Sequence, residues 1–506
     1  MPNSSEVNFA GRLVQRLGEA SCLIDAAKGQ TIAGRELPQL IVGFAAGFLS
    51  AGLRPGDRVL LGCGLSPAST LAYLGAIYAG VVPVPVEERL LTSSGDSLLA
   101  ASHAKAVWTP KGMGCNWVRE GSVSAIEGNF PAQRSESLPP NPCAADDVAA
   151  LMPTSGSTGV PRLVIVSHGN LTSNTQAIIR SQHLGTNERA MLVMPISYCF
   201  GASVLHTHLY QGGGVVFDSR FMFPDRVLHA INSYGCTTFA GVPIIYNVLL
   251  RRSNLKNIPL PGLRRFLQAG GALAAENVQE MREVVPTAEF FVMYGQTEAT
   301  ARISCLPSAR LPDKLGSAGL PLDNLVVRVV DEEGRELPQG ETGEIQVRGP
   351  SVCLGYLDDP ESTERKFGGG WLRTGDFACL DEDGYLWIKG RTDDFIKIRG
   401  VRVSVGEVEA KVGAMAGVSE CAAVGVKHPE AGEAVALLVV PDRGVTNGVI
   451  TDYHGDDFCD RVRRALPSHW TCVEVRVVPA LPRTANGKIA RSQLATLLMT
   501  RSTTTI

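Results

Sequence analysis

The most informative stretch of this 506-residue chain reads Met152-Pro153-Thr154-Ser155-Gly156-Ser157-Thr158-Gly159-Val160-Pro161-Arg162. An apolar run from Val148 precedes it and predicts a buried strand that leads into a loop. The loop glycines let backbone N–H groups approach an anion, the hydroxyl groups add hydrogen-bond donors, and Arg162 adds positive charge. This composition favours a polyphosphate site, although the glycine and lysine spacing of a Walker A loop is absent. Taken alone, the stretch is also typical of a plain Gly/Ser-rich surface loop.

The residues around this loop predict an α/β fold. Helical spacing alternates with short apolar runs, and the same rhythm returns after the loop as far as Val292. Strand–helix–strand order of this kind predicts parallel strands joined by right-handed crossovers. The predicted helices include Leu40–Leu49 and Tyr73–Tyr78, and the predicted strands include Arg58–Gly62 and Val81–Val86.

The pattern changes from about Val326 to short strands with hairpin turns, among them Val326–Val330, Gly343–Arg348 and Tyr385–Lys389. This part is expected to form a β-rich subdomain. A smaller α/β segment follows, and we place a domain boundary at Asp393. Its predicted elements are a helix at Val405–Met415 and strands at Ala422–Val426 and Val435–Val440.

The composition limits the number of domains and the kinds of partner and metal site that we expect. A length of 506 residues allows roughly three domains at about 150 residues each. The hydrophobic share of 44% and the charged share of 19% are those of a globular enzyme. The net charge of -3 shows no basic excess, so we expect no nucleic-acid partner. The 12 cysteines are scattered without a C-x-x-C pair, which favours buried thiols over a zinc or redox site.

No membrane or export signal is expected. The longest apolar run, Leu71–Val86, falls short of the roughly 20 residues that span a bilayer. The N-terminus lacks a basic segment followed by an apolar one, so it does not read as a signal peptide. We therefore expect a cytoplasmic protein without a membrane span.

Read together, the motifs resemble those of the adenylate-forming superfamily, which includes acyl-CoA synthetases, peptide-synthetase adenylation domains, fatty acyl-AMP ligases and luciferases. They occur in family order over nearly the whole chain. The motifs are Thr154–Arg162 with Val166–Leu171, Tyr294-Gly-Gln-Thr297-Glu298, Leu372-Arg-Thr-Gly-Asp376, Gly390-Arg391-Thr-Asp393-Asp394, Ile398-Arg-Gly400-Val-Arg402 and Pro482-Arg-Thr-Ala-Asn-Gly487-Lys488.

The resemblance implies a large N-terminal AMP-binding domain, residues 1–392, of packed α/β subdomains plus the β-rich subdomain. It implies a small, mobile α+β C-terminal domain, residues 393–506, that carries the catalytic lysine. The implied reaction joins a carboxylic acid, fatty or otherwise not an amino acid, to ATP as an acyl-AMP with release of pyrophosphate. Transfer to CoA then gives a thioester. The implied cofactors are ATP, Mg2+ and CoA, or the phosphopantetheine of a carrier protein.

The resemblance implies a role for individual residues of these motifs. Lys488 is the expected catalytic residue, because a long cation between the carboxylate and the α-phosphate relieves the repulsion of two anions. Glu298 is the expected magnesium ligand and Thr297 the expected donor to the α-phosphate. Asp376, with two acceptor oxygens, is expected on the ribose, and Arg391 on the ribose or a phosphate. The remaining expected nucleotide-binding residues are Thr154, Ser155, Gly156, Ser157, Thr158, Gly159, Arg162, Gly270, Gly271, Ala272, Tyr294, Gly295 and Gln296.

The resemblance also implies a hinge at Asp393 and a thiol channel at Gly400, where a small residue leaves room for a pantetheine arm. The expected acyl pocket contains Tyr198, Gly241, Val242, Ala269 and Gln296. Tyr198 stands where acyl-CoA synthetases usually have a gating His, so an aromatic gate and a core tyrosine are both open.

Other departures from the family pattern narrow the function. Arg162 and Leu163 replace the usual Lys and Gly, which keeps the charge but makes the loop bulkier. Gly201 stands where amino-acid-activating relatives often have an Asp, and a buried ammonium without a partner would be costly. We therefore disfavour an α-amino acid as the substrate. The pair His206 and His208 lies on an apolar segment and is expected to be structural rather than metal-binding.

The motifs leave alternatives for the reaction. An acyl-AMP ligase would load a separate acyl carrier protein instead of CoA. A luciferase-like enzyme would oxidise the adenylate, and a non-catalytic relative would only bind the nucleotide. The sequence does not name the acid.

Overall fold

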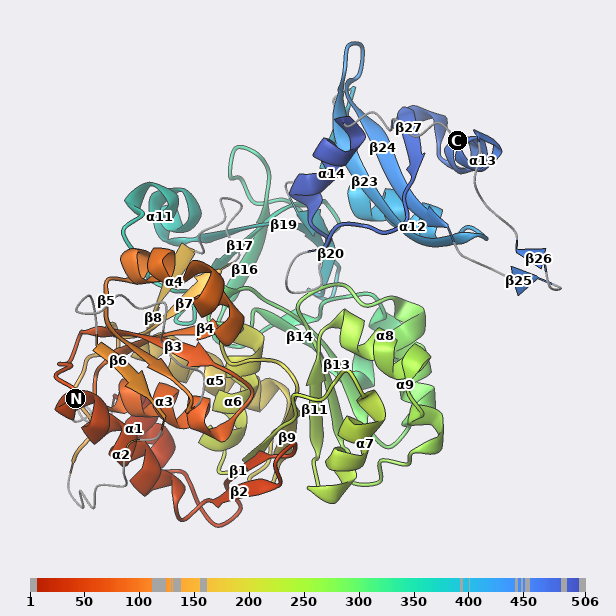
Figure 1. Ribbon diagram of the computed structural model, residues 1–506. Helices are drawn as coiled ribbons and strands as arrows, with labels where there is room; N and C mark the ends of the chain where they lie inside the picture. The colour runs from red at the N-terminus through yellow and green to blue at the C-terminus, as the bar shows by residue number, and fades with distance from the viewer. Residues whose placement is uncertain are drawn as a thin grey trace. The chain divides into compact units, whose positions relative to one another are not determined.

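The fold is described from a computed structural model (Figure 1). The chain divides into two compact units: Met1–Arg328, Gln346–Thr374 and Leu380–Trp387 form the first, and Val329–Ile345, Gly375–Cys379 and Ile388–Ile506 the second. The structure describes residues 7–111, 124–128, 130, 138–154, 162–391, 395–399, 401–441, 445–446, 449–450, 456–483 and 489–499.

The first sheet of the first unit is parallel throughout, with the order β4-β3-β5-β6. This confirms the parallel pairing predicted from the strand–helix rhythm. The helix α3 is buried on nearly all its faces, because it packs against α2 on one side and the sheet on the other. The elements are α1 (Phe9–Val14), α2 (Leu37–Ser50), β3 (Arg58–Cys63), α3 (Pro67–Tyr78), β4 (Val82–Glu87), α4 (Glu88–Ser102), β5 (Ala104–Thr109) and β6 (Ser124–Glu127).

A nine-stranded sheet forms the centre of the same unit, in the order β15-β14-β13-β12-β11-β9-β10-β1-β2. The inner strands from β13 to β1 are parallel, and β2, β14 and β15 pair antiparallel at the two edges. Strands β1, β10, β11 and β12 are buried at every residue, as expected for strands covered on both faces. The strands are β1 (Cys22–Asp25), β2 (Gln30–Ala33), β9 (Arg189–Leu192), β10 (Gly214–Phe217), β11 (Thr238–Gly241), β12 (Arg265–Gln268), β13 (Glu289–Tyr294), β14 (Ser304–Leu306) and β15 (Leu320–Pro321).

Helices connect the parallel strands of this sheet. In Figure 1, α8 lies beside β11 and α9 beside β13, and contacts between these elements agree with the view. The helices are α5 (His168–Ser181), α6 (Cys199–Tyr210), α7 (Pro224–Ser233), α8 (Pro243–Arg252), α9 (Ala275–Val284) and α10 (Leu311–Lys314), with short 3-10 turns at Leu255–Asn257, Thr297–Ala299 and Ser308–Arg310.

The predicted phosphate loop joins two antiparallel strands. The strand β7 (Val148–Thr154) pairs with β8 (Arg162–Ser167), and Thr154 lies opposite Arg162. A short third strand, β18 (Gly355–Tyr356), pairs with the other edge of β8. The two ends of the loop are therefore held together by the ladder, and β18 lies directly beside its second anchor.

The β-rich part predicted from Val326 is also present. It forms a four-stranded sheet in the order β16-β17-β19-β20. Its elements are β16 (Val326–Val330), β17 (Gly343–Arg348), α11 (Pro360–Phe367), a 3-10 turn at Gly368–Gly370, β19 (Leu372–Leu380) and β20 (Leu386–Arg391).

The second unit contains a mixed sheet in the order β22-β21-β24-β23, with β27 on the other edge of β24. Alternate residues of β24 enter two different cores: Val435 and Leu437 pack on one face, Ala436 and Leu438 on the other. The elements are β21 (Phe395–Ile398), β22 (Val401–Ser404), α12 (Val405–Gly413), β23 (Val418–His428), β24 (Gly432–Pro441), β25 (Val445–Thr446), β26 (Val449–Ile450), α13 (Asp456–Ala465), a 3-10 turn at Ser468–Trp470, β27 (Cys472–Val477) and α14 (Arg491–Met499).

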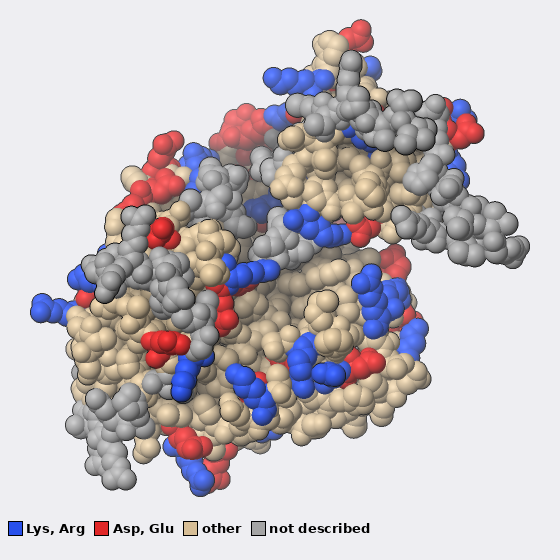
Figure 2. All heavy atoms as spheres, viewed as in Figure 1, with Lys and Arg blue, Asp and Glu red and all other residues tan. Residues whose placement is uncertain are grey.

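Basic and acidic side chains are interspersed over the face shown in Figure 2. Within the part of the chain that the structure describes, the cysteines are unpaired and no helix is long and apolar enough to cross a membrane.

Asn170 fixes the start of α5. Its Oδ1 accepts from Ser167 N at 3.0 Å, and Ser167 Oγ accepts from Asn170 N at 3.1 Å, which is a reciprocal capping box. The Asn170 Nδ2 also donates to the backbone oxygens of Pro350 at 2.8 Å and Val352 at 2.9 Å. One side chain thus caps α5 and ties it to the segment just before β18.

We expect Ser167→Ala to lower the free energy of unfolding by about 1 kcal/mol, the usual loss for a cap. Asn170→Ala should cost about 3 kcal/mol, because it also leaves two backbone acceptors without their donor. Urea denaturation followed by fluorescence measures both. Equal losses for the two variants would contradict the tethering role of Asn170.

Candidate active site

The parallel sheet brings several predicted site residues to one edge. Strands β9, β11, β12 and β13 run in the same direction, and their registers align Gly241 with Gln268 and Gln268 with Val292. The chain leaves each strand at the same edge, which is where open α/β sheets bind ligands. The segments that follow these strands contain Tyr198, Val242, Ala269, Gly270, Gly271, Ala272, Gly295, Gln296, Thr297 and Glu298.

Tyr198 and Val242 both lie close to Gly270 within this group. Gly270 has a φ of +84°, and a Cβ atom built on it would lie 2.5 Å from Tyr198 Oη and 3.1 Å from Val242 Cγ1. Both the backbone angle and the close approach require glycine there. Burial raises the pKa of the half-buried Tyr198, so its phenol is neutral at pH 7. Tyr198 also packs against Phe200 with ring centroids 6.5 Å apart. The place of Tyr198, Gly241, Val242 and Ala269 in an acyl pocket stays a prediction.

The turn after β12 exposes two small residues. Gln268 Nε2 donates to Gly271 O at 2.7 Å and holds the turn after β12. Gly271 and Ala272 are exposed, whereas Ala269 and Gly241 are buried. A Cβ atom built on Gly241 would lie 2.8 Å from Ile245 Cγ2, so a larger residue does not fit without movement.

The segment after β13 makes a tight turn. A Cβ atom built on Gly295 would lie 1.7 Å from Ala301 O, so this position also requires glycine. The turn presents Gln296, Thr297 and Glu298 as half-buried residues. Thr297 Oγ1 donates to Cys199 Sγ at 3.4 Å, and this contact joins the turn to the start of α6.

Glu298 is oriented by a hydrogen bond from a tyrosine. Tyr356 Oη donates to Glu298 Oε1 at 2.6 Å, and Cys353 N donates to Glu298 O at 2.9 Å. Burial, and to a smaller extent the Glu298 charge, raises the pKa of Tyr356. The phenol therefore keeps its proton and holds the carboxylate in one orientation.

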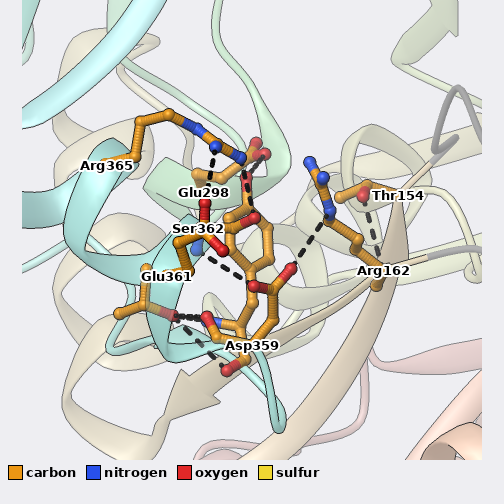
Figure 3. A network of polar contacts seen from close by, with 9 residues as sticks. Thr154, Arg162, Glu298, Asp359, Glu361, Ser362 and Arg365 are labelled. Atoms are coloured by element: carbon orange, nitrogen blue, oxygen red, sulfur yellow. Dashed lines mark hydrogen bonds and ion pairs between the residues drawn. The ribbon is translucent and has the colours of Figure 1, made fainter.

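The second anchor of the phosphate loop joins the same network (Figure 3). The guanidinium of Arg162 lies 5.6 Å from the centre of the Tyr356 ring, and its Nε lies 3.5 Å from Asp359 Oδ2. Thr154 Oγ1 donates to Arg162 O at 3.4 Å. Asp359 also accepts from Ser362 N at 2.9 Å, and this bond caps α11 and lowers the pKa of Asp359.

Asp376 and Arg391 form a pair of their own in the second unit. Asp376 lies on β19 and Arg391 ends β20, and Arg391 Nε is 3.1 Å from Asp376 Oδ1. Asp376 is buried while Arg391 is largely exposed. The backbone just before Asp376 is fixed by a bond from Gly375 N to Glu344 Oε1 at 3.1 Å.

Several predicted site residues lie outside the described residues. These are Ser155, Gly156, Ser157, Thr158, Gly159, Asp393, Gly400 and Lys488. Their roles, and the domain boundary at Asp393, stay predictions.

The two histidines of α6 are packed in the interior. His206 stacks on Tyr73 with ring centroids 5.6 Å apart, and His208 Nδ1 contacts Val204 O at 2.9 Å. Burial lowers the pKa of His206 to about 3 and that of His208 to about 4, so both are neutral at pH 7. Among the described residues, no group of three or more His, Cys, Asp or Glu side chains is placed to hold a metal ion.

Three residues of this region lie outside the sequence motifs and were not predicted: Tyr356, Asp359 and Arg302. Tyr356 is 58 positions from Glu298 in the chain, and no spacing rule connects them. Arg302 lies four residues after Glu298, where the motif has ended, and is buried.

The chain belongs to the AMP-binding enzyme family. The family model for the AMP-binding enzyme matches residues 12–357, and the model for the AMP-binding enzyme C-terminal domain matches residues 407–488. The protein is therefore an adenylate-forming enzyme of the acid–thiol ligase class, with the fold expected from the sequence.

Named proteins of this family are similar over nearly the whole chain. A feruloyl-CoA synthase from Amycolatopsis is 33% identical, with 92% of this chain and 94% of that protein covered. ATP-bound MatB from Rhodopseudomonas palustris superposes with a TM-score of 0.85 at 28% identity, covering 97% of this chain and 98% of MatB. o-Succinylbenzoate CoA synthetase from Bacillus subtilis, solved with its acyl-adenylate intermediate, gives 0.83 at 26% identity, covering 96% and 97%.

The bond from Tyr356 to Glu298 leads to a prediction about magnesium. If Glu298 holds the metal, Tyr356→Phe should raise the Mg2+ concentration needed for half-maximal pyrophosphate release by roughly 10-fold, because groups that orient a metal ligand contribute about that much affinity. At saturating Mg2+ most of the activity should return. Tyr385→Phe, which changes a tyrosine outside the Glu298 network, serves as the control. An unchanged Mg2+ dependence in Tyr356→Phe would contradict the orienting role.

Proposed function

We propose that this enzyme activates an aromatic carboxylic acid with ATP and Mg2+ and transfers the acyl group to CoA. The observation that carries the proposal is the arrangement at the sheet edge, where the Thr297–Glu298 turn and the Tyr198–Gly270 contact lie on adjacent strand ends. Family membership over nearly the whole chain supports the same reaction.

Two observations favour an aromatic acid over the fatty acid that the sequence left open. Two of the similar proteins are named for aromatic acids, a feruloyl-CoA synthase and an o-succinylbenzoate CoA synthetase. The side chains around the proposed pocket include Tyr198 and Phe200, whose rings meet edge to face at 76°. Aromatic rings prefer such contacts with other planar rings.

The first half-reaction brings two anions together. A carboxylate oxygen of the acid bonds to the α-phosphorus of ATP, and the bond from that phosphorus to the bridging oxygen of pyrophosphate breaks. In the proposal, Thr297 donates to the α-phosphate, Arg162 and the loop before it hold the departing pyrophosphate, and Lys488 bridges the two reacting anions. Placed donors and cations of this kind stabilise the charge that develops in the transition state.

Glu298 fits the magnesium role. Mg2+ is commonly bound by one or two carboxylates together with substrate phosphates and water. Glu298 is one oriented carboxylate, and the phosphates of ATP and water would supply the other ligands of the metal. When bound, Mg2+ would neutralise negative charge on the phosphates.

The adenosine part would lie against other residues. We propose that Gly270, Gly271 and Ala272 face the adenine with their exposed backbone, near Tyr294, Gly295 and Gln296. Asp376 would accept from the ribose hydroxyl groups, and Arg391, whose Nε is 3.1 Å from Asp376 Oδ1, would hold that carboxylate in place.

The second half-reaction uses the thiol of CoA. The thiol loses its proton to solvent and the sulfur bonds to the acyl carbon. The bond from that carbon to the phosphate-bound oxygen breaks, and AMP leaves with this oxygen. We propose that the C-terminal domain turns about Asp393 between the two half-reactions and that Gly400 leaves room for the pantetheine arm.

A panel of acids tests the substrate class. Substituted benzoic and cinnamic acids should give acid-dependent pyrophosphate release and a CoA thioester, at rates at least 10-fold above those of straight-chain acids of six to sixteen carbons. Thioester formation with long-chain acids alone would contradict the aromatic assignment. Acylation of a carrier protein but not of CoA would contradict the acceptor, and absence of pyrophosphate release with every acid would contradict the activity.

Lys488→Ala tests the catalytic lysine. Adenylation should fall by at least roughly 100-fold, because the like charges of the reacting groups are no longer offset. Thioester formation from supplied acyl-AMP and CoA should be retained, since that step no longer joins two anions. The control is Lys427→Ala, an exposed lysine of β23. Full adenylation in Lys488→Ala would show that another residue has this role.

A further inference from the structure

Arg302 is a buried arginine in the turn between β13 and β14. Its side chain is among the largest fully buried ones, with 2% exposure for the residue. The backbone is fixed by Asn174, whose Nδ2 donates to Arg302 O at 2.9 Å. The guanidinium carbon lies 4.9 Å from the centre of the Phe200 ring. Backbone and side chain are thus both held in place.

The guanidinium has no anionic partner among the described residues. No carboxylate there lies within ion-pair distance, its nitrogens donate no hydrogen bond, and Nε is enclosed without an acceptor. A second buried arginine, Arg265, does have an anionic partner. Its Nη1 donates to Glu188 Oε1 at 2.6 Å and its Nη2 to His183 O at 3.1 Å.

Arg302 remains charged in spite of its burial. Burial lowers the pKa of its guanidinium to about 10, which still leaves the group protonated at pH 7. A buried charge without a counter-ion is unfavourable, and contact with one aromatic ring offsets only part of that cost. The protein therefore maintains a positive charge that lacks its expected partner.

The Arg302 guanidinium lies near the residues of the proposed acyl pocket. Phe200, which lies under the guanidinium, also packs against Tyr198, and the Tyr198 hydroxyl lies close to Gly270. The Arg302 charge acts on Tyr198 and on Cys199, lowering the pKa of each against the larger opposite effect of burial. Arg302 thus lies close enough to the residues that would hold the acid for its charge to act on them.

We propose that Arg302 is a specificity-determining residue that binds a second carboxylate on the acid substrate, so that the enzyme activates an aromatic dicarboxylic acid. This inference rests on the proposed function, because it assigns the far end of the molecule whose other carboxylate reacts with ATP. A guanidinium matches a carboxylate with two parallel hydrogen bonds, which gives orientation as well as charge pairing. Binding would supply the counter-ion that the fold omits.

The unpaired guanidinium of Arg302 also determines which acids the enzyme prefers. A neutral group of the same size would leave the guanidinium buried and unpaired in the complex, so such an acid should be discriminated against strongly. An ammonium-bearing acid would place two positive charges together. The site therefore selects by charge, whereas a purely apolar pocket distinguishes acids mainly by size.

The test compares matched acids that differ in one group. The pairs are the three benzenedicarboxylic acids against the corresponding methylbenzoic acids, and 4-carboxycinnamic acid against 4-methylcinnamic acid. Pyrophosphate release gives kcat/KM for each acid, and the ratio within a pair is unaffected by the fraction of enzyme that is folded. We expect the wild-type enzyme to favour the dicarboxylic member of at least one pair by roughly 100-fold.

Two variants then assign that preference to Arg302. Arg302→Met, which keeps an unbranched side chain without charge, should reduce the ratio at least 10-fold or reverse it. Arg302→Lys should keep the direction of the preference with a smaller ratio, because the charge remains but the paired hydrogen bonds do not. Glu280→Gln, at an exposed ion pair with Arg251 on α8 and α9, should leave the ratio unchanged.

The outcomes separate the two proposals. A wild-type preference for the neutral member in every pair, or a ratio that is the same in Arg302→Met, overturns the role of Arg302 while the proposed function stands. In that case Arg302 is a structural residue held by Phe200. Absence of pyrophosphate release with any acid, aromatic or aliphatic, overturns the proposed function itself.

Discussion

The parallel register of the central sheet is the constraint on which the candidate site depends. Neighbouring strands that run in the same direction must end at the same edge, so the segments after β9, β11, β12 and β13 meet there although they are far apart in the chain. Gly270 and Gly295 then allow the approaches that a side chain would block. Without that register, Tyr198, Gly270 and Thr297 would have no reason to share one wall.

Many helices and strands could be predicted from the sequence, because the apolar spacing that specifies them is a local property of the chain. Strand β3 and helix α2 were expected within a few residues of their observed bounds, because their apolar spacing specifies them directly. Strand β23 extends beyond the predicted 422–426 to Val418–His428, because its length is set by pairing with β24 rather than by its own composition. Tyr356 could not be predicted, since only the pairing of β18 with β8 brings it to Glu298.

The buried charged residues of the first unit differ in whether they have an ion-pair partner. Two buried charges of this unit have partners: Arg265 pairs with Glu188, and Asp218 pairs with Arg220. Arg302 differs, because the described residues offer its guanidinium a ring but no anion. In our proposal, the buried guanidinium that the fold leaves unpaired beside the proposed acyl pocket receives its anion from the substrate.

The central claim is that the acid passes through an acyl adenylate before the thiol attacks. An aromatic acid labelled with oxygen-18 in its carboxylate, allowed to react with ATP and CoA, tests this directly when the nucleotide product is analysed by mass spectrometry. The account predicts one labelled oxygen in AMP and none in pyrophosphate, because AMP leaves with the oxygen that the carboxylate contributed. Formation of ADP with the label in inorganic phosphate would contradict it, since the acid would then have reacted at the γ-phosphate.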